Sequence, residues 1–105
     1  MQPTLADIHA AANTIRGIAD ATPLVPSPYM SERAGAEFLL KLENMQPIGA
    51  FKLRGALNAV AGVGDAAVVT CWSTGNHGRG VAYAARARGM RAVDCMSELV
   101  PQAKV

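Results

Sequence analysis

The residue best placed to do chemistry is Lys52, in the segment from Gln46 to Gly55. A helix is predicted from Phe51 to Val60, so the amine of Lys52 lies in the first helical turn. The helix dipole disfavours a cation there by about 0.3–1 kcal/mol. The same position favours the neutral amine, which is the form that condenses with a carbonyl compound. Lysines in first turns are not rare, so an ordinary surface lysine stays open for this segment alone.

A second loop runs from Ser73 to Gly80, between an apolar strand and an alanine-rich helix. Its glycines let the backbone approach a ligand, and amides at the start of a helix form an anion site. A carboxylate or phosphate would fit there, although a turn that only packs a helix on a sheet is the alternative. His77 by itself is typical of a structural hydrogen-bonder, and nothing pairs it with Ser73 in a hydrolase triad.

Alternating helices and strands must position these two loops. The pattern predicts helices at 5–19, 28–34, 51–60 and 77–88, and strands at 38–43, 66–71 and 91–96. Thr4 and Asp7 indicate the start of the first helix, and Pro23 its end. Such alternation is typical of an α/β protein with right-handed parallel crossovers, in which ligands bind at the carboxyl ends of strands. Both loops lie at such ends.

Composition narrows the classes of partner. The chain has 105 residues, half of them apolar and 17% charged, with a net charge of +2. No run approaches the ~20 apolar residues of a membrane span, and the first residues lack a signal-peptide pattern. Four arginines cluster with a single aromatic residue, Tyr83, among them, at Arg79, Arg86, Arg88 and Arg91. We interpret them as a solvated helix face and expect neither nucleic acid nor membrane as a partner.

The cysteines and histidines give no sign of a metal site. Cys71 and Cys95 both lie in apolar stretches, so we expect two buried, reduced thiols, which suits the cytoplasm. His9 and His77 have no partners at ligand spacing. We therefore predict no bound metal.

Taken together and in this order, the two loops resemble those of the fold-type II pyridoxal-phosphate (PLP) enzymes, the family of threonine dehydratase, serine dehydratase and serine racemase. Residues 41–43 (KLE) followed by 49–56 (GAFKLRGA) are similar to that family's Schiff-base lysine motif. Residues 73–78 (STGNHG) are similar to its asparagine loop, and residues 22–24 (TPL) to its entry segment. The resemblance runs from about residue 4 to residue 105.

The resemblance implies an α/β fold with the parallel-sheet, three-layer architecture of the tryptophan synthase β-like PLP enzymes, here incomplete. Residues 1–50 would begin the larger domain, and residues 51–105 would begin the smaller domain that carries both loops. The family's glycine-rich phosphate cup lies further along the chain than residue 105. We therefore expect an N-terminal fragment that does not hold the cofactor stably by itself, and a homo-oligomer at full length.

The implied reaction is α,β-elimination of water from a β-hydroxy amino acid. Lys52 would carry PLP and take the Cα proton, Phe51 would pack against the cofactor, and Asn76 would bind its phenolic oxygen. The substrate carboxylate would lie against Ser73, Thr74, Gly75, Asn76 and His77. Residues 73–79 and 95–101 are most similar to hydroxyectoine-utilization dehydratases, so the substrate is threonine-like, serine-like or hydroxyectoine-derived. Thr74 lies where racemases of this family have a serine, which leaves racemisation open.

Two other functions stay open. A dinucleotide-binding loop is loosely matched by Gly75, Gly78 and Gly80, although the order of the glycine spacings is reversed. Asp94 lies some 20 residues beyond the first glycine, where such a loop has its ribose-binding acid. A non-catalytic fragment is the second. Two residues depart from the family pattern: we expect Trp72 to crowd the second loop, and Asp94 to place an unpaired carboxylate in a strand, which is costly when buried.

Overall fold

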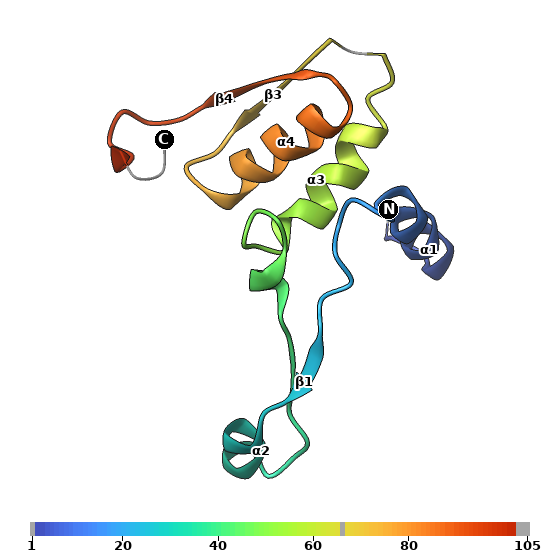
Figure 1. The fold of residues 1–105 in the computed structure, drawn as a ribbon, viewed down its shortest axis with the longest axis vertical. Helices are drawn as coiled ribbons and strands as arrows, with labels where there is room; N and C mark the ends of the chain where they lie inside the picture. Colours follow the sequence, from blue (N-terminus) through green and yellow to red (C-terminus); the bar gives the residue numbers. More distant parts are fainter. Residues whose placement is uncertain (1, 66, 103–105) are drawn as a thin grey trace.

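The computed structural model describes residues 2–65 and 67–102. Helices and strands alternate along most of the chain (Figure 1). The elements are α1 (Leu5–Thr14), β1 (Leu24–Pro26), α2 (Pro28–Ala34), β2 (Leu39–Lys41), the 3-10 helix η1 (Glu43–Met45), α3 (Lys52–Ala61), β3 (Val68–Trp72), α4 (Asn76–Ala87) and β4 (Arg91–Cys95). Strands β1 and β2 pair antiparallel, whereas β3 and β4 pair parallel.

Helix α1 begins as predicted but ends early. The Thr4 hydroxyl accepts the Asp7 amide at 3.2 Å, and the Asp7 carboxylate accepts the Thr4 amide at 2.7 Å, which is a capping box. The helix stops at Thr14 rather than at 19, and the chain turns through Gly17 at φ 79°. The predicted helical spacing is wrong beyond this point, because Ile15 and Ile18 reach the core from turns instead.

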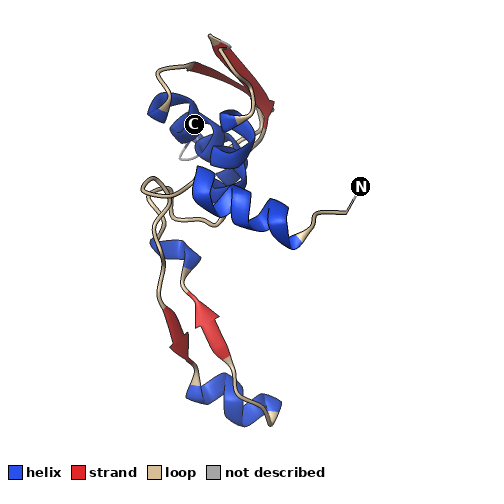
Figure 2. Cartoon of the chain, turned by 90° about the vertical axis from the view of Figure 1, so that its right-hand side faces the viewer, coloured by secondary structure: helices blue, strands red, loops and turns tan. Residues whose placement is uncertain are grey.

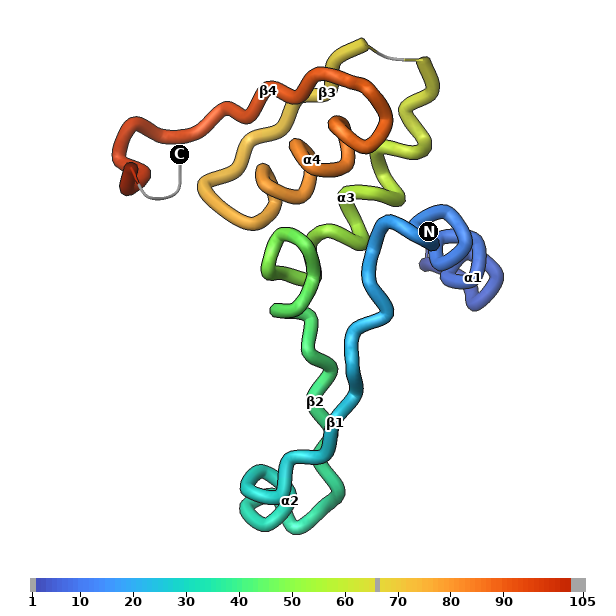
Figure 3. The backbone as a smooth tube through the Cα atoms, viewed as in Figure 1, coloured from blue at the N-terminus to red at the C-terminus, as the bar shows by residue number. Residues whose placement is uncertain are grey.

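An extended arm carries β1, α2 and β2 away from the rest of the chain (Figures 2 and 3). Ser27 caps α2, Pro28 is its first residue, and Gly35 ends it at φ 64°, as predicted. Strand β1 was not expected, and β2 covers only part of the predicted 38–43. Glu43 belongs to η1 instead.

The parallel unit has the predicted order of strand, helix and strand. The register pairs Thr70 with Val93, and α4 lies against β3 and β4, with α3 packed on α4 (Figure 1). The predicted start of β3 at residue 66 lies outside the described residues. Val68 is 41% exposed and Val93 is 42% exposed, so within the described residues no helix covers the second face of this sheet. Two of the three expected layers are therefore present there.

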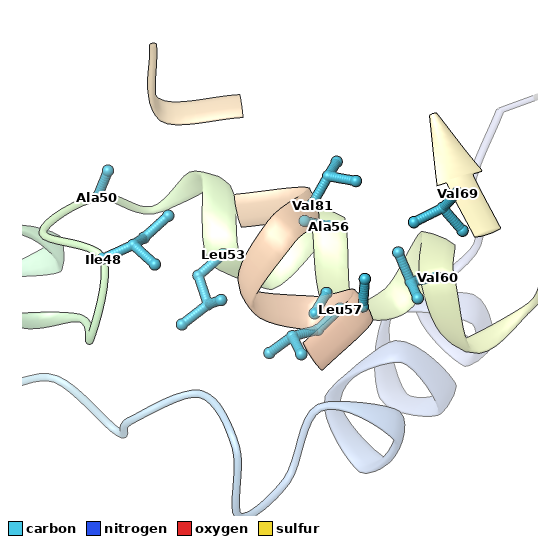
Figure 4. Packing of buried hydrophobic residues seen from close by; sticks show 10 residues of the cluster. Ile48, Ala50, Leu53, Ala56, Leu57, Val60, Val69 and Val81 are labelled. Atoms are coloured by element: carbon cyan, nitrogen blue, oxygen red, sulfur yellow. The ribbon is translucent and has the colours of Figure 1, made fainter. Parts of the chain in front are cut away.

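The hydrophobic core lies between α3, α4 and β3. Leu53 is fully buried toward one end of this cluster, Val60 and Val69 lie toward the other end, and Val81 lies between them (Figure 4). Gly80 lets the two helices touch: a Cβ there would lie 3.2 Å from the Ala56 Cβ. The same Cβ would lie 3.3 Å from the Lys52 carbonyl oxygen. The starts of α3 and α4, which carry the two candidate loops, are thereby held side by side.

Candidate active site

The first loop delivers Lys52 as the first residue of α3. Gly49 adopts φ 72°, and its amide donates to the Gln46 carbonyl at 2.7 Å, which turns the chain toward the helix. Phe51 is the N-cap residue and provides no side-chain cap. Lys52 is exposed, and its Nζ lies 5.5 Å from the centre of the Phe51 ring. The lysine motif therefore presents its amine beside an aromatic face.

A network of polar side chains around the Glu43 carboxylate holds this loop in place. Arg54 donates from Nε to Glu43 Oε2 and from Nη2 to Glu43 Oε1, both at 2.8 Å. The Thr22 hydroxyl also donates to Glu43, and the Lys41 amine donates to the Thr22 carbonyl. Gln46 Nε2 donates to Glu43 Oε2 at 3.3 Å. The Glu43 carboxylate in η1 thus joins Thr22, which precedes β1, to Arg54 in α3.

The network fixes the protonation state of its central residue. Hydrogen bonds from Arg54 lower the pKa of Glu43 to about 2, against the opposing effect of burial. Sequence reasoning noted 41–43 and 22–24 only as parts of a resemblance and missed what joins them. No spacing rule links Thr22 to Glu43 or Arg54, because the contact depends on the β1–β2 pairing.

The second loop is held by one hydrogen bond within it and by another to the end of β4. The Ser73 hydroxyl accepts the Gly75 amide at 3.2 Å, and the Ser73 amide donates to the Cys95 carbonyl at 3.2 Å. Asn76 begins α4, and no side chain caps this helix. The amides of Thr74, Asn76, His77 and Gly78 find no acceptor among the described residues. Gly78 is buried, so the first three amides, and not those of Ser73 and Gly75, are available to an anionic ligand.

The two loops share one concave space. A cavity of 310 Å³ is lined by Phe51, Lys52, Arg54, Gly55, Ala56 and His77. Thr74 lines a different hollow of 260 Å³, together with Ser97, Leu99, Val100 and Pro101. Asn76 is exposed and lines neither of these two. The structure thus brings Phe51, Lys52 and His77 together and leaves Thr74 and Asn76 beside them, on the same loop.

Three sequence expectations need correction. Asp94 is paired, since it accepts the Ser73 amide at 3.0 Å and the Cys71 thiol at 3.3 Å. Trp72 is 79% exposed, so little of the chain packs against its side chain and the expected crowding of the loop is absent. Cys95 is exposed and Cys71 only partly buried, so the expected pair of buried thiols is wrong.

Other features bear on the class of site. Burial, and then the hydrogen bond to Asp94, raise the pKa of the Cys71 thiol to about 11, so this thiol is a poor nucleophile. Within residues 2–65 and 67–102, no group of three or more His, Cys, Asp or Glu side chains is placed to hold a metal. None of the described helices is long and apolar enough to cross a membrane.

The chain is similar to enzymes that act on hydroxy amino acids. It is 43% identical over 105 residues to the β-hydroxyaspartate dehydratase of Paracoccus denitrificans, covering 97% of this chain and 33% of that protein. It is 39% identical over 105 residues to the L-threonine ammonia-lyase of Thermotoga maritima, covering 97% of this chain and 26% of that protein. The chain spans about a third of the length of the first curated relatives it matches.

Solved structures agree with this similarity. Maize serine racemase superposes with a TM-score of 0.91 at 31% identity, over 99% of this chain and 32% of that one. The Asp94 carboxylate accepts the Ser73 amide, which does not favour the dinucleotide-binding alternative, in which Asp94 would bind a ribose. The family model described as "Pyridoxal-phosphate dependent enzyme" matches residues 15–105. The lysine loop, the asparagine loop and this match together show that the chain belongs to the pyridoxal-phosphate dependent enzymes.

Proposed function

We propose that the protein containing this chain is a PLP-dependent lyase that eliminates water from a β-hydroxy amino acid. One observation carries the proposal: Lys52 and His77 line a single cavity, beside amides of the second loop that lack acceptors among the described residues. An amine and an anion site side by side suit a ligand that has both a carbonyl-derived group and a carboxylate.

The residues present fit the cofactor. Phe51 offers an aromatic face at the cavity wall, and Lys52 offers the primary amine that bonds to an aldehyde. When bound, PLP supplies an electron sink for the pair of electrons left at Cα. Asn76, the first residue of α4, would bind the phenolic oxygen of the cofactor ring.

In the proposed reaction, this chain's residues bind the substrate and move one proton. The amides of Thr74, Asn76 and His77 bind the substrate carboxylate, which fixes the direction of the Cα–H bond. The Lys52 amine, once released from the cofactor, takes the Cα proton. The β-hydroxyl leaves as water, and hydrolysis of the product gives a 2-oxo acid and ammonia.

Finer parts of the proposal rest on sequence similarity. Relatives named for threonine and hydroxyaspartate support a β-hydroxy amino acid as substrate. Among these we propose a threonine-like, serine-like or hydroxyectoine-derived one, the last from residues 73–79 and 95–101. We also propose a cytoplasmic homo-oligomer, in which residues 1–50 begin a larger domain and 51–105 a smaller one.

Borohydride trapping tests the proposal. The protein, produced at the length that its gene encodes, is incubated with PLP, reduced and digested, and the labelled peptides are identified by mass spectrometry. We expect the label on Lys52 and a parallel release of 2-oxo acid from L-threonine or L-serine. Lys41 is the internal control, because its amine donates a hydrogen bond to the Thr22 carbonyl.

Two results would contradict the proposal. Equal labelling of Lys41 and Lys52 would mean that Lys52 has no special environment. Retention of elimination activity by Lys52→Ala would remove its assigned role, since we expect that variant to lose at least about a thousandfold in kcat. Measuring D-serine formation in the same assay separates racemisation from elimination.

A further inference from the structure

Asp94 lies at the point where the second loop meets the sheet. Its Oδ1 accepts the Ser73 amide at 3.0 Å and the Cys71 thiol at 3.3 Å. Parallel pairing places Asp94 opposite Cys71, one residue before β3 ends at Trp72. The carboxylate therefore reaches the first loop residue from the neighbouring strand.

Gly78 provides the space that this carboxylate occupies. A Cβ built on Gly78 would lie 1.7 Å from Asp94 Oδ2 and 2.7 Å from its Cγ, which no real structure allows. Gly78 is buried in the first turn of α4, where a negative charge is favourable and where no side chain caps the helix. Any side chain at 78 would expel the carboxylate from its place beneath the loop.

The position of Asp94 decides which amides face a ligand. The Asp94 carboxylate and the Cys95 carbonyl both accept the Ser73 amide and hold it toward the sheet. The Ser73 hydroxyl then holds the Gly75 amide at 3.2 Å. The amides of the exposed residues Thr74, Asn76 and His77 are left without acceptors among the described residues.

We propose that Asp94 is a positioning residue for substrate binding: it fixes Ser73 inward, so that the amides of Thr74 and Asn76 are presented to the substrate carboxylate. The inference rests on the proposed function for the identity of the ligand. It assigns a role to a side chain that touches neither cofactor nor substrate. The space at Gly78 and the bond to Ser73 are two separate observations that support it.

Asp94→Ala and Asp94→Asn test the proposal. The first removes the acceptor, whereas the second keeps one oxygen that can accept the Ser73 amide. We expect Asp94→Ala to raise the KM for L-threonine about tenfold, as expected for one lost hydrogen bond, with a smaller change in kcat. Asp94→Asn should recover most of the loss. Asp65→Asn, in an exposed turn away from the loop, is the matched control.

Hydrogen exchange gives a readout that does not depend on activity. In the cofactor-free protein, exchange in a peptide spanning 71–75 should speed up about tenfold in Asp94→Ala, because the Ser73 amide loses its 3.0 Å bond to the carboxylate and keeps only the 3.2 Å bond to the Cys95 carbonyl. Unchanged exchange there would overturn the proposal. If exchange responds but Lys52 is not labelled by PLP and borohydride, the proposed function fails while the inward fixing of Ser73 stands.

A second pair of variants tests the role of Gly78. Gly78→Ala should behave like Asp94→Ala, since its Cβ expels the carboxylate. Gly78→Ala with Asp94→Ala should be no worse than Asp94→Ala alone, because the space is then vacant. Additive losses would contradict the proposal. Gly62→Ala, whose Cβ meets only an ordinary 3.5 Å contact at the end of α3, is the control.

Discussion

The loops before α3 and α4 are each held by a carboxylate from another element, but the two carboxylates are balanced differently. Glu43 forms a two-pronged ion pair with Arg54 and accepts further bonds from Thr22 and Gln46. Asp94 bonds to one amide and one thiol, and among the described residues it has no cationic partner within salt-bridge distance. The first anchor is an ion-pair network, and the second is a single acceptor.

The difference indicates what each loop has to do. The Glu43 network joins the arm, η1 and α3, so it fixes where helix α3 begins relative to the arm. The Asp94 anchor orients a few amides without bringing a compensating cation near the anion site.

Gly80→Val tests whether the two loops serve one ligand, and its expected effect is the largest among the variants that compare the two loops. A side chain at 80 would force apart the starts of α3 and α4, because a Cβ already lies 3.3 Å from the Lys52 carbonyl oxygen. We expect kcat/KM to fall about a hundredfold, as a misplacement of about 1 Å does. Unfolding in urea should show a loss of about 1–3 kcal/mol. Normal activity would mean that the loops work independently.

Arg54→Ala tests the first anchor. Removing the guanidinium leaves the partly buried Glu43 carboxylate with only neutral partners, so we expect the free energy of unfolding to fall by about 2–3 kcal/mol. Arg54→Lys should recover less than half of this loss, because an ammonium group does not reproduce the two-pronged geometry. Urea denaturation of the three proteins at pH 7 measures both. Full recovery of stability in Arg54→Lys would mean that the positive charge alone, and not the two-pronged geometry, provides the stabilisation.

The sequence predicts best what local rules decide. Thr4 with Asp7, and Ser27 with Pro28 and Gly35, mark helix ends through contacts a few residues apart. The lysine and asparagine loops can also be predicted from the sequence, since each joins a strand or turn to a helix within one short segment. In the structure, Lys52 and His77 line one cavity.

What the sequence does not predict depends on pairing between distant segments. Strand β1 has three residues and exists only by pairing with β2, so nothing local indicates it. Asp94 reads as an isolated carboxylate until the parallel register places it opposite Cys71. The apolar spacing in α1 continues past its end, because Ile15 and Ile18 are needed in the core whatever the backbone does there.

The pH dependence of stability sharpens the comparison further. Because the pKa of Glu43 is lowered from 4.5 to about 2, its contribution is present in full above pH 4.5 and is lost as the pH falls toward 2. Allowing for solvent screening, we expect wild type to exceed Glu43→Gln by about 1–2 kcal/mol at pH 6. Urea unfolding at several pH values should show this difference shrinking between pH 4.5 and 2. A constant difference would place the stabilisation in packing.

The smallest expected effect reports on the second anchor through Cys71. Burial is the main reason that the pKa of this thiol is raised to about 11, and the hydrogen bond and charge of Asp94 add to it. In a Cys95→Ser background, Asp94→Asn should therefore lower the Cys71 pKa and speed its alkylation by iodoacetamide at pH 9 by about two- to fivefold. Asp65→Asn in the same background controls for net charge. A larger increase would mean that the substitution also opens the strand, and an unchanged rate would show that Asp94 does not contact the thiol in solution.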